Sequence, residues 1–69
     1  MGQYVSVTGP YAEQDRHGDE FPVWSVAICQ GEDEVVKAYT VAGRERAVEL
    51  GAKIARDRRL EFVNEAGRA

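Results

Sequence analysis

The spacing of the apolar residues changes once along this chain, and that change restricts the fold more than any other feature. In residues 3–8 the apolar side chains alternate with period two, so that Val5 and Val7 share one side. From Arg44 onward they recur three and four positions apart, which is the spacing of an amphipathic helix. The helical stripe consists of Ala47, Leu50, Gly51, Ile54 and Ala55. The chain is therefore predicted to form strands first and then one helix.

The first strand is expected to cover residues 3–8 and to end at Gly9-Pro10, a strong breaker pair. In the stretch 11–20 the apolar residues show no regular spacing, and many of the residues are charged. We expect it to be a long, mobile connection without strand structure.

Residues 21–29 are rich in β-branched and aromatic side chains, and both alternating sets are mostly apolar or small. This pattern favours a central strand that is covered on both faces. A turn at Gly31 then leads to a third strand over residues 34–41, so that the two form an antiparallel hairpin. After the helix, apolar and polar residues alternate at the start of residues 60–63, and the length of this segment suits a short fourth strand.

These elements predict an α+β fold (β-β-β-α-β): a three-stranded antiparallel meander, one helix packed on one face, and a short C-terminal strand. A chain of 69 residues buries only about 60% of its unfolded surface, so we expect a single domain over residues 1–69. The predicted core is Val5, Val7, Val23, Trp24, Val26, Ile28, Val36, Leu50, Ile54 and Phe62.

The sequence signals that mark the two ends of the predicted helix differ in strength. No good N-cap residue precedes Arg44, whereas Arg56, Arg58 and Arg59 place cations where the helix dipole is negative. Gly51 interrupts the apolar stripe at a cost of about 1 kcal/mol relative to Ala. We expect close approach of the helix to the sheet, beneath Trp24, to compensate for that cost.

Cys29 is the only cysteine, so no internal disulfide forms, and a reducing, cytoplasmic location is expected. No apolar run approaches the roughly 20 residues that cross a bilayer, and no signal-peptide pattern is present. The sequence therefore predicts neither export nor a membrane partner.

Catalysis is not expected, since the serines and Cys29 fall within predicted strands and the single histidine, His17, falls in the charged stretch. That stretch could gather Glu13, Asp15, His17 and Asp19 around a divalent cation, but their spacing fits no established metal loop. A solvated acidic segment is the preferred interpretation, without metal or cofactor.

Charge is divided unevenly along the chain. Residues 1–36 carry seven acids against Arg16, whereas residues 37–69 carry eight bases against five acids. Four bases cluster near the end of the predicted helix: Lys53, Arg56, Arg58 and Arg59. Because the helix surface mixes both signs and the pI is near 5.0, a solvated face is favoured and nucleic-acid binding is the alternative.

The stretches "VWSVAI", "VVKAYTVAGRERAVELGAKIA" and "LEFVNEAGR" span about two thirds of the chain. Their order, a Trp-bearing strand, a second strand, a helix and a strand that ends in an acidic-Gly-Arg turn, resembles that of small uncharacterised bacterial and phage proteins. In size, acidity and build the chain is also similar to some anti-CRISPR proteins. The resemblance implies a fold and no activity. The N-terminal strand and the charged stretch of residues 9–20 are departures from it, since the simplest members lack both.

The function expected from the sequence is a non-catalytic protein-interaction module, of phage or mobile-element character. Its interaction surface would be an exposed strand edge or the acidic stretch with Glu13, Asp15, His17 and Asp19. Residues 3–8 hold neither charge nor proline, so we expect a homodimer through the edge of this first strand. The alternative is a nucleic-acid accessory protein that uses the bases at the helix end.

Overall fold

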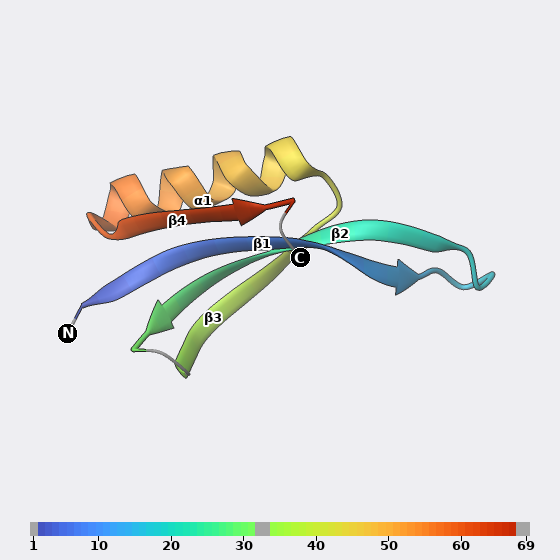
Figure 1. The fold of residues 1–69 in the computed structure, drawn as a ribbon, viewed down its shortest axis with the longest axis horizontal. Coiled ribbons are helices and arrows are strands. Elements are labelled where there is room, and N and C mark those ends of the chain that lie inside the picture. Colours follow the sequence, from blue (N-terminus) through green and yellow to red (C-terminus); the bar gives the residue numbers. More distant parts are fainter. Residues whose placement is uncertain (1, 32–33, 68–69) are drawn as a thin grey trace.

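The computed structural model describes residues 2–31 and 34–67 and confirms the predicted α+β fold (Figure 1). The elements are β1 (Gln3–Gln14), β2 (Glu20–Gln30), β3 (Glu34–Val41), α1 (Arg44–Arg58) and β4 (Glu61–Ala66). Three residues for which the sequence predicts turns, Glu32, Asp33 and Arg68, lie outside the described residues.

The four strands form one sheet in the order β3-β2-β1-β4. β2 pairs antiparallel with β1 and with β3, which confirms the hairpin and the central position of β2. β4 pairs parallel with β1, from Tyr4 opposite Glu61 to Gly9 opposite Ala66. Such a parallel strand requires a crossover, and α1 supplies it by carrying the chain from the end of β3 across the sheet.

The position of β4 corrects one expectation. β1 lies between β2 and β4, so its edge is occupied on both sides and cannot receive another strand there. Residues 3–8 lack charge because the strand is central, not because it is an open edge. Strand order decides this point, and a single sequence with a short fourth strand does not reveal strand order.

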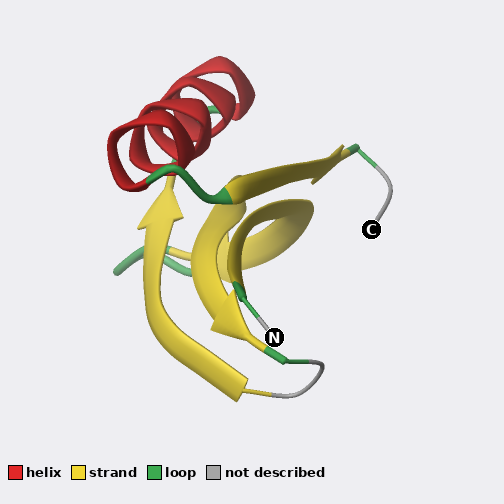
Figure 2. Ribbon diagram, turned by 90° about the vertical axis from the view of Figure 1, so that its left-hand side faces the viewer, coloured by secondary structure: helices red, strands yellow, loops and turns green. Residues whose placement is uncertain are grey.

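The helix packs on one face of the twisted sheet (Figure 2). On that face Val5 and Val7 of β1 pair with Ile28 and Val26 of β2, and all four side chains are almost completely buried. Ala47 and Ala55 of α1 complete the buried cluster. Partly buried side chains packed around it are Trp24, Tyr39, Val41, Val48, Leu50, Ile54, Leu60, Phe62 and Ala66. The opposite face of β2 carries the small residues Ser25 and Ala27, which remain partly exposed, so the helix covers only one of its faces.

Gly51 lies where the helix is closest to the sheet, as the sequence predicted. A Cβ atom at this position would stand 2.6 Å from Val7 Cγ2 and 2.9 Å from Phe62 Cε1. The expectation that Trp24 lies above Gly51 is wrong. Trp24 instead packs against Gly9, whose absent Cβ would stand 2.7 Å from Trp24 Cδ1.

Val36 was expected in the core and is 50% exposed. In the ladder between β2 and β3, Ile28 pairs with Lys37 and Cys29 pairs with Val35, so Val36 is an extra residue, a β-bulge. Lys37, Tyr39 and Val41 pair with Ile28, Val26 and Trp24 on the face that carries the helix. Val36 directly precedes Lys37, so the alternation of β3 keeps it off that face, and Tyr39 and Val41 pack against the core instead. Val23 of β2, also a predicted core residue, is buried at 4% exposure but is not part of the cluster beneath the helix.

The ends of α1 agree with the sequence. Gly43 is the N-cap and no side chain caps the first turn. The chain leaves the helix at Arg59 in the left-handed region, with φ of 55°, and Leu60 N–H donates to the Ala55 carbonyl at 2.8 Å. This exit directs the chain straight into β4.

Gly9-Pro10 does not end the first strand. The peptide bond between them is cis, Gly9 has a φ of 136°, and the register of β1 with β2 shifts between Thr8 and Tyr11. Beyond this irregularity both strands continue, so half of the stretch 11–20 is β-structure and only residues 15–19 form the connection, which is a turn and not a long mobile loop.

Candidate functional site

The feature that stands out from this compact fold is a two-stranded ribbon, which we call the arm and define as residues 10–22. Its strand pairs run from Tyr11 opposite Val23 to Gln14 opposite Glu20. β4 accompanies β1 only as far as Gly9, and β3 accompanies β2 only from Trp24 onward. Among the described residues no third strand therefore joins the arm, which projects past the helix and the rest of the sheet (Figure 1) and is exposed at every residue.

The tip of the arm is an ordered turn held by one carboxylate. Asp15 Oδ1 accepts hydrogen bonds from the backbone N–H groups of His17, at 2.8 Å, and Asp19, at 3.0 Å. Gly18, with a φ of 83°, donates its N–H to the Asp15 carbonyl at 3.1 Å. An Asp at the start of a turn commonly bonds the backbone two residues ahead in this way. Asp15 thus stabilises the turn, and the described residues hold no group of three or more potential metal ligands.

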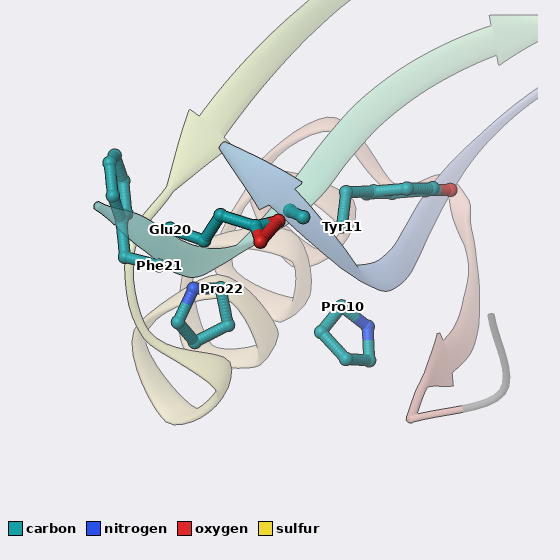
Figure 3. Close-up of a pocket in the computed structure, with 6 residues that line it drawn as sticks. Pro10, Tyr11, Glu20, Phe21 and Pro22 are labelled. Carbon is teal, nitrogen blue, oxygen red and sulfur yellow. The ribbon is translucent and has the colours of Figure 1, made fainter. Parts of the chain in front are cut away.

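An open hollow of about 340 Å³ lies along the arm, close to its base (Figure 3). The lining residues come from both strands: Pro10, Tyr11, Ala12, Glu20, Phe21 and Pro22. Figure 3 shows the rings of Pro10 and Pro22 on one side of the ribbon, the rings of Tyr11 and Phe21 directed away from each other, and the Glu20 carboxylate between these two residues in this view. The lining is apolar except for this carboxylate and the Tyr11 hydroxyl.

Both aromatic side chains of the hollow are well exposed, Tyr11 at 46% and Phe21 at 38%. Tyr11 is held in place because its hydroxyl donates to Thr8 Oγ1 at 2.8 Å. That bond fixes the ring without covering its face.

The arm is also strongly acidic. It carries Glu13, Asp15, Asp19 and Glu20 against Arg16 as its formal positive charge. All of these side chains are exposed. A ligand that enters the hollow therefore meets apolar rings, one central carboxylate and a negative surrounding field.

The two groups of residues that the sequence singled out lie at opposite ends of the molecule, which measures 42 × 23 × 20 Å. Glu13, Asp15, His17 and Asp19 lie on the arm, beyond the end of the central part of β1. The bases Lys53, Arg56, Arg58 and Arg59 lie on and just after the last turns of α1, which leads into β4 opposite the start of β1. Figure 1 shows the end of the helix and the tip of the arm at the two ends of the long axis.

The sequence did not identify Tyr11, Phe21, Pro10 and Pro22 as site residues. Two aromatic side chains, each next to a proline and surrounded by charge, were the available signal. It was overlooked because the stretch was interpreted as a mobile connection, in which side chains have no fixed relation to one another.

The four bases at the end of α1 are all exposed. In the part of the chain that the structure describes, they have no ion-pair partner. Asp57 and Glu61 lie among them, and the negative end of the helix dipole points toward them. Both features oppose a phosphate group at this position.

A second hollow, of about 410 Å³, lies between the start of α1 and β4. Its lining, Arg44, Glu45, Val48, Glu49 and Asn64, mixes both signs of charge and has one apolar side chain. The lining of this second hollow is therefore neither mainly acidic, mainly basic nor mainly apolar.

Among the described residues, no helix combines the length and the apolar character that crossing a bilayer requires. Comparisons with protein-family models, with curated proteins and with solved structures found no match to this chain.

Proposed function

We propose that this protein is a non-catalytic interaction module whose arm binds a basic segment of another protein. The observation that carries the proposal is the open hollow of the arm, whose lining combines the exposed Tyr11 and Phe21 and two prolines with the carboxylate of Glu20.

The arm contributes little to the stability of the fold. A two-stranded ribbon with both faces in water is at best marginally stable by itself, and none of the residues 10–22 belongs to the core cluster. Exposing two aromatic side chains, Tyr11 and Phe21, on such a ribbon has no structural advantage. Exposed aromatic patches bordered by polar residues are typical of interaction sites.

The chemistry of the hollow favours an arginine or lysine side chain as its occupant. An aliphatic stem can lie on the proline and aromatic rings while its cationic end meets the Glu20 carboxylate. Arginine fits best, because its planar guanidinium stacks on an aromatic face and pairs with a carboxylate at the same time. The other acids of the arm attract the surrounding positive charge of the segment.

Nucleic-acid binding through Lys53, Arg56, Arg58 and Arg59 has weaker support. These bases share their surface with Asp57 and Glu61, and no aromatic ring suited to base stacking is exposed among them. The acidic arm at the other end of the molecule would also repel a polyanion.

Binding of a fluorescein-labelled hexa-arginine peptide at physiological ionic strength, followed by fluorescence anisotropy, tests the proposal. Glu20→Gln removes the central carboxylate, and Phe21→Ala removes one ring without a change in charge. Each is expected to weaken binding about threefold or more, the size of an exposed cation–π contact or ion pair.

Glu49→Gln is the matched control, because it removes the same charge from an exposed position on α1. It should leave the affinity within error of the parent. Equal losses for Glu20→Gln and Glu49→Gln, with none for Phe21→Ala, would show that the peptide responds to net charge alone.

A further inference from the structure

β3 is an edge strand whose outer side is open. It pairs with β2, and no other strand of the described chain lies beside it. Its eight residues contain no proline. Val35 is 57% exposed and Val36 is 50% exposed. An apolar edge of this kind is a template for another strand.

The β-bulge decides which side chains share a face at the start of β3. Val35 pairs with Cys29 and Lys37 pairs with Ile28, with Val36 as the extra residue between them. Without the bulge, Lys37 and Val35 would lie on the same face, because side chains alternate along a strand. With it, Lys37 lies beside Ile28 on the face that carries the helix, while Val35 lies on the opposite face with Cys29.

Glu34 lies on the same face as Lys37. It pairs with Gln30, two residues from Ile28 along β2 and therefore on the face that carries the helix. Lys37 is oriented along this face, with its Nζ 5.3 Å from the centre of the Tyr39 ring. The sequence Glu34-Val35-Val36-Lys37 thus places one acid and one base on one face, with the two exposed valines between them.

We propose that a second copy of this chain pairs with β3, antiparallel and about a two-fold axis between Val35 and Val36. In this register Glu34 of each copy lies opposite Lys37 of the other copy, twice in the dimer. Val35 lies opposite Val36 of the other copy, so four valines cover one another. Opposite charges and apolar pairs directly across two strands are the arrangements that stabilise antiparallel pairing.

The other open edge lacks this complementarity. The charged residues of β4 are Glu61 and Glu65, both exposed. Symmetric antiparallel pairing of two β4 strands about Val63 would place Glu61 opposite Glu65 of the other copy. Like charges directly opposite one another are destabilising. The chain therefore distinguishes its two edges, and β3 is the one that accepts a copy of itself.

A dimer through β3 leaves both arms free. Glu34 pairs with Gln30, and Gln30 pairs with Gln3 at the start of β1, so this edge lies at the end of the sheet opposite the arm. The two arms would project in opposite directions from the dimer. Such an arrangement lets one dimer engage two basic segments at once.

Sedimentation equilibrium of the full chain and of four variants tests the proposal, with circular dichroism to confirm folding. The parent is expected to be a dimer. Glu34→Lys and Lys37→Glu each place like charges opposite one another and should each raise the dimer dissociation constant about tenfold or more. The double variant Glu34→Lys with Lys37→Glu restores opposite charges and should return it to within about threefold of the parent value.

Glu61→Lys, which changes an exposed charge on the other edge, is the control and should leave the dissociation constant unchanged. Rescue by the double variant is the decisive result. A monomeric parent, failure of the double variant to recover, or growth into species larger than a dimer, as pairing of β3 with β4 would produce, overturns the proposal.

Discussion

Gly51 occupies the position where the helix touches β1 and β4. The sequence places a glycine in the apolar stripe of a helix, at a cost in helix propensity, and close approach to the sheet was predicted from that cost. The contact partners, Val7 and Phe62, were not predictable in the same way. They depend on where β4 enters the sheet, which a pattern local to the helix does not contain.

Gly51→Ala is expected to lower the free energy of unfolding by on the order of 1 kcal/mol, although alanine is the better helix former. The added methyl group would stand 2.6 Å from Val7 Cγ2, and overpacking of this kind costs about 1–3 kcal/mol, more than the ~1 kcal/mol gained in propensity. Urea denaturation followed by circular dichroism measures the difference. Ala52→Gly, at the exposed neighbouring position, reports propensity alone and should also destabilise. An increase in stability for Gly51→Ala would contradict the close packing.

At the scale of the elements, the central strands and the arm differ in what the sequence could reveal. Val5, Val7, Val26 and Ile28 alternate because a helix covers one face of the sheet, and this alternation is what identified their strands. The arm has water on both faces, so nothing imposes an apolar period on it. Its strand structure follows from continuation of the β1–β2 ladder, which is a property of the pair and not of either segment.

The arm is expected to open independently of the core. Its backbone hydrogen bonds are exposed, and no third strand or helix of the described chain supports them. The backbone amides of residues 11–14, 20 and 21 should therefore exchange with solvent through low-energy local opening. The hydrogen-bonded amides of Val5, Val7, Val26 and Ile28 should exchange only through global unfolding. Native-state hydrogen exchange followed by NMR compares the two groups. Equal protection in both would mean that the arm is part of the cooperative unit.

At the scale of the whole molecule, charge and shape act together. The division of the sequence into an acidic first half and a basic second half indicated a polar molecule. The structure places the acidic arm and the basic end of α1 at the two ends of a 42 Å axis. That separation arises because β4 runs parallel to β1 and returns the end of the helix to the start of the sheet. The acidic arm is therefore kept away from the chain's own bases and remains available to a basic partner.

The most direct test of the central claim, that the arm is the binding element, is an NMR titration of the ¹⁵N-labelled protein with the hexa-arginine peptide. The largest changes in amide chemical shift are expected at residues 11–14 and 19–21, around the hollow that Tyr11, Glu20 and Phe21 help to line. Glu34, Glu49 and Glu61, which are exposed acids elsewhere on the surface, should change little. Changes distributed over all exposed acids, or centred away from the arm, would contradict the account.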